Sequence, residues 1–225
     1  MKSLMIETST ERGMVCFLDE RKVLYHKEFP FGINNSKTLI PAIHEGLHAL
    51  QLQVSNLDFI GVGTGPGSYT GMRVGAMTAK SISYAVKVPL VGISTLQCFI
   101  PQQNGSFAVL IDAKIGGAYV IIGRKKGKEV TYDSEPQVRE IPFLGDFLRS
   151  VERIVTPDAK KLRHTLEKFY PNAKWEWEEI PPNPVHMGEL AKEKFKKNQF
   201  STDGHLELHY LRKTQAEIEK ENKIS

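Results

Sequence analysis

One order of segments occurs twice in this chain of 225 residues. Each half begins with an apolar strand that ends on an acidic residue, and a glycine, a second strand, a basic turn and a third strand follow. Ile6-Glu7-Thr8-Ser9 aligns in this way with Ile111-Asp112-Ala113-Lys114, which brings Gly13 within one residue of Gly117. A repeat close to half the chain length indicates a duplicated lobe that faces its copy across a cleft. The two halves share little sequence identity, so the alternative to a duplication is that their similarity arose by chance.

Alternating strand and helix patterns predict an α/β protein with two lobes, each a mixed sheet flanked by helices. Strands are expected at 4–6, 14–18, 23–29, 57–62, 90–93, 107–111, 118–122, 129–132, 153–155 and 174–177, with a basic turn at 124–128. Helices are expected at about 36–53, 71–86, 143–151, 159–169 and 185–197. Residues 1–100 then form the first lobe, completed by about 198–212, and 101–197 form a smaller second lobe. The polar tail at 213–225 is expected to be frayed.

The composition fits a globular, cytoplasmic protein. Hydrophobic residues make up 40% of the chain and charged residues 25%, so it can bury a core. Thirty Lys and Arg against 26 Asp and Glu leave a net charge of +4, which permits RNA binding without indicating it. Cys16 and Cys98 lie among apolar neighbours, as reduced thiols of cytosolic proteins do. Glu7 interrupts the N-terminal apolar segment, and no run of about 18 apolar residues occurs, so neither export nor a membrane span is expected.

His44-Glu45-Gly46-Leu47-His48 matches the zinc-peptidase motif H-E-x-x-H. A helix would place both histidines beside its apolar stripe, on the polar flank. A catalytic zinc ion also needs a third protein ligand, but Gln51 and Val54 stand where the extended motif requires Gly and His. Gly46 fits close helix packing at least as well as a metal site. A zinc peptidase is therefore the weakest of the functions considered.

The glycine-rich segment 63–71 follows a predicted strand and begins a predicted helix. In that position backbone N–H groups can hold an anion. The segment lacks the Lys of a phosphate-binding P-loop, since Met72 and Arg73 follow Gly71, and its glycines are out of register for the dinucleotide motif. A tight strand-to-helix turn that needs glycine is the other interpretation, and the sequence leaves both open.

The helix that follows this loop is apolar almost all round. Gly71, Gly75, Ala79 and Ser83 recur every four residues and form a seam of small side chains, which lets another backbone approach closely. The only charged residues on its other faces are Arg73 and Lys80. Such a helix needs cover on more than one side. The expected cover is a partner subunit, and burial by the second lobe is the alternative.

Three segments carry a resemblance to a known family. They are Ile6-Glu7-Thr8-Ser9, then Gly65-Pro66-Gly67-Ser68-Tyr69-Thr70-Gly71-Met72-Arg73-Val74-Gly75 followed by Ala79-Lys80, and Pro89-Leu90-Val91-Gly92-Ile93-Ser94-Thr95-Leu96. With this spacing the chain resembles the TsaB (YeaZ) family. The resemblance is strong over 1–100, weaker through 112–114, and returns at 210–212. It implies the actin/Hsp70-like (ASKHA) duplicated fold.

The resemblance implies a non-catalytic partner of the paralogue TsaD, which transfers a threonylcarbamoyl group to adenosine 37 of tRNA. The metal ligands of TsaD form an H-x-x-x-H motif, and Thr95 and Phe99 stand at the matching positions here. Glu7 stands where most of the family have Asp, and Asn35-Ser36 replaces a frequent His-Ser. No catalytic residue, metal or other cofactor is therefore expected for this chain alone, whereas ATP and a metal are expected in the partner complex.

In the family the first two helices dock on the equivalent helices of the partner. Carried over to this chain, the expected interface is Leu39, Ile40, Ile43, Leu47, Leu50, Met72, Gly75, Ala76, Ala79, Ile82 and Ser83. The expected partners are a TsaD-like paralogue, a TsaE-like ATPase and, through the complex, tRNA; alone, the chain could form a homodimer. A vestigial nucleotide cleft is expected at Glu7, Thr8, Ser9 and Asp112. The main alternative is a stand-alone nucleotide-dependent transferase that holds magnesium with Glu7 and Asp112.

Overall fold

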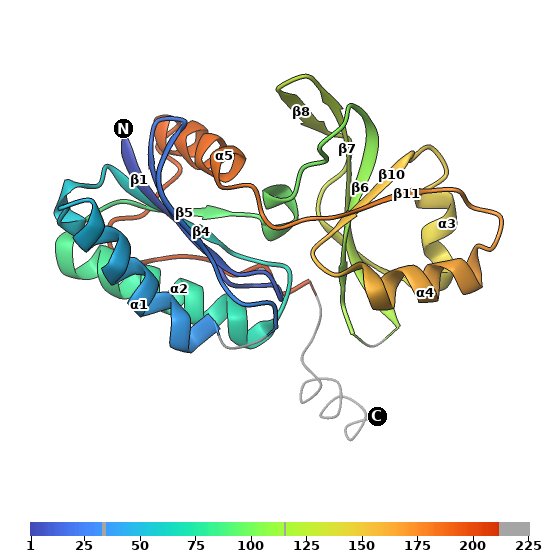
Figure 1. Ribbon diagram of the computed structural model, residues 1–225, viewed down its shortest axis with the longest axis horizontal. Coiled ribbons are helices and arrows are strands. Elements are labelled where there is room, and N and C mark those ends of the chain that lie inside the picture. Colours follow the sequence, from blue (N-terminus) through green and yellow to red (C-terminus); the bar gives the residue numbers. More distant parts are fainter. Residues whose placement is uncertain (33–34, 115, 212–225) are drawn as a thin grey trace.

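The first half of the chain forms a five-stranded mixed sheet (Figure 1). The computed structural model describes residues 1–32, 35–114 and 116–211. The strands are β1 (Lys2–Glu7), β2 (Met14–Asp19), β3 (Lys22–Glu28), β4 (Phe59–Gly63) and β5 (Leu90–Ile93), in the order β3-β2-β1-β4-β5. β1, β2 and β3 pair antiparallel, whereas β1, β4 and β5 pair parallel, so that Met5 lies opposite Cys16 on one side and Gly61 on the other.

The second half repeats this topology. Its strands are β6 (Gly105–Asp112), β7 (Gly117–Lys126), β8 (Glu129–Tyr132), β10 (Arg153–Thr156) and β11 (Glu176–Glu179), in the order β11-β10-β6-β7-β8. Three strands again pair antiparallel and the rest parallel, and β9 (Gln137–Glu140) adds a further antiparallel strand to β7. Strand order and direction therefore match strand by strand, which confirms the α/β fold with two duplicated lobes that the repeat predicted.

Helices cover both faces of the first sheet. α1 (Asn35–Ala49) and α2 (Tyr69–Val86) lie together on one face, and α5 (Pro184–Lys196) lies on the other (Figure 1). The sequence-based boundaries instead count α5 with the second lobe. α3 (Leu144–Phe147) and α4 (Ala159–Phe169) pack on the second sheet, and 3-10 turns occur at Val54–Asn56, Thr95–Cys98 and Ile141–Phe143.

One hydrophobic cluster joins the two lobes. Met5 and Met14 of the first sheet, Phe107 and Val109 of the second, and Met187 of α5 belong to it, and each is fully buried. The burial of apolar side chains from both sheets in one cluster holds the lobes together. Among the residues that the structure describes, no helix is long and apolar enough to cross a membrane.

The structure corrects the ends of the first two helices. α1 begins at Asn35 rather than Ser36 and ends at Ala49 rather than residue 53, because Gln51 adopts a left-handed conformation (φ 51°) and the Leu52 N–H bonds back to the Leu47 carbonyl oxygen (3.0 Å). α2 begins at Tyr69, where Ser68 caps it by accepting a hydrogen bond from the Gly71 N–H (3.3 Å).

Several second-lobe predictions are also wrong in position. β7 continues to Lys126, so the predicted basic turn shrinks to Gly127 and Lys128, and the last strand is 176–179 rather than 174–177. The helix predicted at 143–151 is a short 3-10 turn and a single turn of α-helix. The chain bends after it, where the Val151 N–H bonds to the Leu148 carbonyl oxygen (3.1 Å), and buries both side chains against the second sheet. The tail predicted at 213–225 and Arg212 lie outside the described residues.

Candidate functional site

Glu7 ends β1 and lies wholly inside the protein. Its Oε1 accepts a hydrogen bond from the Ser9 N–H (2.5 Å), and its Oε2 accepts one from the Thr95 hydroxyl (3.0 Å) and a long one from the Cys98 thiol (3.8 Å). Burial raises the pKa of Glu7, since removal from water disfavours the carboxylate, and these hydrogen bonds only partly oppose the shift. Gly63 supplies the space, because a Cβ there would overlap the Glu7 carboxyl group. Glu7 is therefore an internally bonded group, closed to solvent.

Thr8 and Ser9 lie against the glycine-rich loop. A Cβ at Gly67 would lie 2.2 Å from the Ser9 carbonyl oxygen, and one at Gly71 would lie 2.1 Å from the Thr8 carbonyl oxygen. The Ser68 N–H donates to the Ser9 carbonyl oxygen (2.7 Å), and the Thr8 hydroxyl donates to the Gly71 carbonyl oxygen (2.8 Å). Only glycine permits so close an approach of two backbones. The loop therefore serves as a tight strand-to-helix turn packed on the segment after β1.

The seam of small residues on α2 faces the first lobe itself. Gly71, Gly75, Ala79 and Ser83 are all buried, and a Cβ at Gly75 would lie 2.3 Å from Thr8 Oγ1. The expectation that a partner backbone packs on this seam is corrected, because the seam already lets α2 lie close to its own sheet.

Asp112 ends β6, at the position that the repeat aligns with Glu7, but it has a different environment. Its Oδ2 lies 3.0 Å from Lys161 Nζ and 3.8 Å from Lys114 Nζ, and its Oδ1 accepts a hydrogen bond from the Lys114 N–H (2.8 Å). Since Glu7 bonds to Ser9, Thr95 and Cys98 instead, the two carboxyl groups do not share partners. A magnesium-bound nucleotide needs exposed, unpaired carboxylate oxygens. The residues present do not fit such a ligand.

Ion pairs join the two lobes beside these carboxyl groups. Arg12 Nη2 lies 2.6 Å from Glu179 Oε1, and Arg12 Nε donates to the Pro157 carbonyl oxygen (2.8 Å). Lys114 Nζ lies 3.2 Å from Glu11 Oε1. The segment after β1 is thus fastened directly to the second lobe.

Asn35 has a structural role that the sequence left unassigned. Its side-chain amide donates to the carbonyl oxygens of Thr8 (2.9 Å) and Thr10 (3.3 Å) and is buried there. The start of α1 is therefore tied to the segment after β1.

The H-E-x-x-H segment lies on the exposed side of α1. The rings of His44 and His48 stack with centroids 6.5 Å apart, and Glu45 forms an ion pair with Lys27. Within the described residues, no group of three or more His, Cys, Asp or Glu side chains is placed to hold a metal ion. Gly46 lies against Phe17 and Tyr25, where a Cβ would overlap both rings, so it serves close helix packing.

The interface residues expected from the resemblance are mostly inside the lobe. Ile40 is exposed, and Leu47, Leu50 and Ile82 are partly buried. The others are buried: Leu39, Ile43, Met72, Gly75, Ala76, Ala79 and Ser83. Seven of the eleven expected contacts thus belong to the first lobe's own packing.

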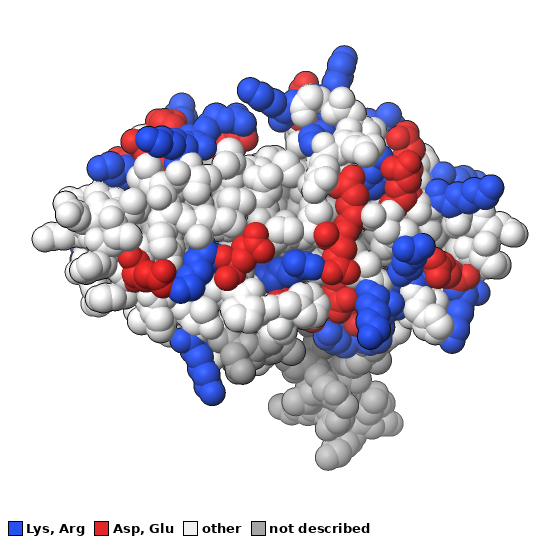
Figure 2. Space-filling model, viewed as in Figure 1, with Lys and Arg blue, Asp and Glu red and all other residues white. Residues whose placement is uncertain are grey.

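A different set of side chains from the same two helices reaches solvent. Ile40 is 55% exposed, Met77 60% and Tyr84 65%, and His44 and Arg73 are exposed beside them. We call these five residues the outer helix face. Figure 2 shows charged side chains of both signs over both lobes, with uncharged surface between them at the left end of the first lobe. Exposed large apolar side chains grouped on neighbouring helices are typical of a protein-binding surface.

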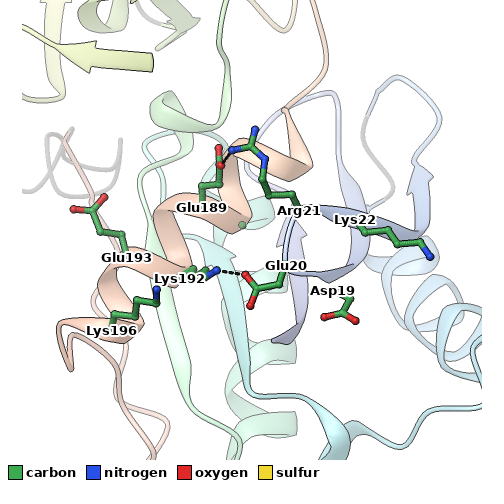
Figure 3. A pocket seen from close by; sticks show the side chains of 9 residues that line it. Asp19, Glu20, Arg21, Lys22, Glu189, Lys192, Glu193 and Lys196 are labelled. Carbon is green, nitrogen blue, oxygen red and sulfur yellow. Dashed lines mark hydrogen bonds and ion pairs between the residues drawn. The ribbon is translucent and has the colours of Figure 1, made fainter. Parts of the chain in front are cut away.

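A pocket of about 610 Å³ lies on the opposite side of the first sheet, between the β2–β3 turn and α5 (Figure 3). Arg21 pairs with Glu189 and Lys192 with Glu20 across it. The other charged side chains at its lining are Asp19, Lys22, Glu193 and Lys196. Cations and anions are equally represented in this lining, so it has no marked preference for a charged ligand.

His186 of α5 meets the second lobe at Tyr132 of β8. The Tyr132 hydroxyl lies 3.0 Å from His186 Nε2 and donates to the Gln97 carbonyl oxygen (3.1 Å). Burial, together with repulsion from Arg21 and Lys125, lowers the pKa of His186 to about 4. The imidazole is therefore neutral at physiological pH.

Residues 32–142 match the family described as TsaD, tRNA N6-adenosine threonylcarbamoyltransferase. The chain is 29% identical over 124 residues to the tRNA threonylcarbamoyladenosine biosynthesis protein TsaB of Escherichia coli (strain K12) and 30% identical over 122 residues to that of Bacillus subtilis (strain 168). Each alignment covers 53% of this chain and 53% of the relative, so the chain spans about half the length of the curated relatives it matches.

Two solved structures share the fold. YeaZ from Pseudomonas aeruginosa superposes with a TM-score of 0.78 at 18% identity, covering 93% of this chain and 99% of that one. A second crystal structure from the same species, described as similar to peptidase YeaZ, gives a TM-score of 0.79 at 18% identity and covers 94% and 99%. In its sequence matches and its fold, this chain is similar to members of the TsaB (YeaZ) family.

Proposed function

We propose that this chain is a non-catalytic subunit that binds a TsaD-like paralogue through the outer helix face and so activates threonylcarbamoylation of tRNA adenosine 37. Its relatives are named for the biosynthesis of tRNA threonylcarbamoyladenosine, and the family that matches residues 32–142 is named as the transferase. The observation that carries the proposal is the exposure of Ile40, Met77 and Tyr84 on two neighbouring helices. A partner that covers them would remove apolar surface from water.

The carboxyl groups support a binding role over a catalytic one. Glu7 is sealed and internally bonded, Asp112 is neutralised by two lysines, and Thr95 and Phe99 are fully buried. Neither Thr nor Phe can replace an imidazole at a metal site. We therefore assign no cofactor to this chain alone and assign ATP and the metal to the cytoplasmic complex, which a TsaE-like ATPase and tRNA join.

The test is a substitution on the outer helix face that leaves the fold intact. Met77→Asp should weaken binding to the TsaD-like paralogue by about 2 kcal/mol, or roughly thirtyfold, because it places a charge in the apolar part of the contact. Since Met77 is 60% exposed, the thermal unfolding midpoint of the variant should stay close to that of the unmodified protein. Calorimetric titration of the paralogue measures the affinity.

Phe143→Asp is the matched control, because Phe143 is 69% exposed on the second lobe, away from both helices. It should leave the affinity unchanged. Equal affinities for the unmodified protein and Met77→Asp would refute the docking surface. Threonylcarbamoylation of tRNA, or turnover of ATP, by the purified chain alone would refute the non-catalytic role.

A further inference from the structure

Arg73 is fixed by two tyrosines at the rim of the outer helix face. Its guanidinium carbon lies 3.9 Å from the centroid of the Tyr69 ring, and its Nε donates a hydrogen bond to the Tyr210 hydroxyl (3.2 Å). The two tyrosine rings are 5.3 Å apart. Stacking and a hydrogen bond together restrict a side chain that otherwise has many rotamers. Arg73 is thus held in one orientation before any partner binds.

Tyr210 reaches Arg73 because the segment before it is anchored on the first lobe. The His209 N–H donates to the Thr64 carbonyl oxygen (2.9 Å), and Leu206 packs against the core of that lobe. Tyr69 is 39% exposed and Tyr210 44%, so the cluster stays open to solvent.

The outward-facing donors of Arg73 have no partner within the described part of the chain. Nε is the guanidinium atom that bonds to Tyr210, so Nη1 and Nη2 are left to donate elsewhere. A planar pair of N–H donors matches the two oxygens of a carboxylate. Met77 lies one helical turn further along α2, so an anion bound to Arg73 would lie next to the apolar part of the outer helix face.

The charges around this face indicate what the partner carries. α1, α2 and the residue after α2 contain Lys37, Arg73, Lys80 and Lys87 but only one acidic residue, Glu45, which is paired with Lys27. Four cations with no acidic counterpart on the same two helices favour an acidic partner surface. They disfavour a second copy of this chain, because a symmetric contact would bring these cations close to their own copies.

We propose that Arg73, held by Tyr69 and Tyr210, binds a carboxylate side chain of the partner that docks on the outer helix face, and that this charge pairing selects the paralogue over a second copy. The proposal rests on the proposed function. Arg73 makes the contact, and Tyr210 acts as a positioning residue.

Binding of the TsaD-like paralogue tests the contact. Arg73→Gln should weaken the affinity about tenfold or more, and the dependence of the affinity on NaCl concentration should become shallower, because one ion pair is lost. Arg73→Lys should recover only part of the affinity, since an ammonium group cannot form the planar pair of hydrogen bonds. Lys126→Gln, an exposed cation on β7, is the matched control and should bind normally.

Tyr210→Phe removes the hydroxyl but keeps the ring. When Arg73 is present, Tyr210→Phe should weaken binding of the paralogue severalfold. In the Arg73→Gln variant it should have no further effect, whereas a purely structural role of Tyr210 would cause the same loss of affinity in both proteins. Sedimentation of the chain alone should show that self-association strengthens from 50 to 500 mM NaCl while binding of the paralogue weakens.

The outcomes separate this proposal from the proposed function. If Met77→Asp weakens binding and Arg73→Gln does not, the docking surface stands and the carboxylate contact is refuted. If neither substitution weakens binding of the paralogue, the proposed function is refuted as well. If Arg73→Gln lowers the affinity of the assembled complex for tRNA but not the affinity of the two proteins for each other, the anion is an RNA phosphate and the proposal is overturned.

Discussion

At the scale of single residues, Glu7 is a carboxyl group enclosed by the protein. The side chain fills the space beside Gly63 and accepts hydrogen bonds from Ser9 and Thr95, deep between β1 and the 3-10 turn after β5. The side chain has no exposed surface. Because a buried carboxylate loses its hydration, the neutral acid is the favoured form, and the pKa is raised.

This raised pKa predicts a pH dependence of stability. Below pH 4.5 the folded and unfolded chains both hold the proton on Glu7. As the pH rises, the unfolded chain releases it first, so the stabilisation linked to Glu7 is lost as the pH passes through the folded-state pKa. Glu7→Gln cannot ionise and should be more stable than the unmodified protein at pH 8, with the difference shrinking towards pH 4. Urea denaturation at both pH values measures this.

Glu7→Ala is the informative control. It removes the titration too, but it leaves the Ser9 N–H and the Thr95 hydroxyl without their acceptor, so it should cost about 2 kcal/mol or more at pH 4. A Glu7→Gln protein that is less stable than the unmodified protein at pH 8 would mean that the carboxylate is the native form.

At the scale of elements, α2 packs very closely on the segment after β1. In an exposed helix, Gly→Ala stabilises by about 1 kcal/mol. At Gly71 the sign should reverse, because the new methyl group would overlap the Thr8 carbonyl oxygen, and overpacking costs about 1–3 kcal/mol. Gly71→Ala should therefore lower the free energy of unfolding, as chemical denaturation would show.

Thr70→Ala tests the same turn of α2 without the overlap. Thr70 is exposed, so this change should be nearly neutral or slightly stabilising. If Gly71→Ala stabilised the protein as much as Thr70→Ala, the close approach of α2 to the segment after β1 would be wrong.

Periodicity predicted most elements but not the orientation of α2. Strand patterns located β5 and β8 correctly, and the helix expected at 159–169 is α4. In α2, by contrast, almost every face is apolar, so composition cannot say which stripe packs inwards. The glycines decide it, since only they let the helix approach Thr8. The exposed apolar face then carries Met77 and Tyr84, which the resemblance did not single out.

Other gaps have a physical reason as well. β9 escaped prediction because Gln137–Glu140 has no apolar alternation; its pairing with β7 defines it. The bond between Glu7 and Thr95 and the bonds of Asn35 join segments far apart in the sequence, which no local pattern encodes. The repeat nevertheless predicted two duplicated lobes, and the two sheets share one strand order apart from the added β9.

At the scale of the whole molecule, the two lobes form one body. The shared core, the Arg12–Glu179 pair and the contact between Tyr132 and His186 all cross from one lobe to the other. His186 comes from α5, which covers the first sheet, whereas Tyr132 belongs to the second. Arg21 and Lys125, one from each lobe, both repel a positive charge on this imidazole.

Acid should therefore weaken the junction of the lobes through His186. As the pH falls below 6.5 the unfolded chain takes up a proton on this residue, but the folded chain does so only near its pKa of about 4, so stability is lost between these values, by roughly 3 kcal/mol in full. His186→Gln keeps a donor for the Tyr132 hydroxyl and cannot titrate. Urea denaturation at pH 7.5, 5.5 and 4.5 measures the stability of both proteins. As the pH falls, the variant should become more stable relative to the unmodified protein. A stability difference that does not change with pH would mean that His186 takes up its proton as easily in the folded protein as in the unfolded chain.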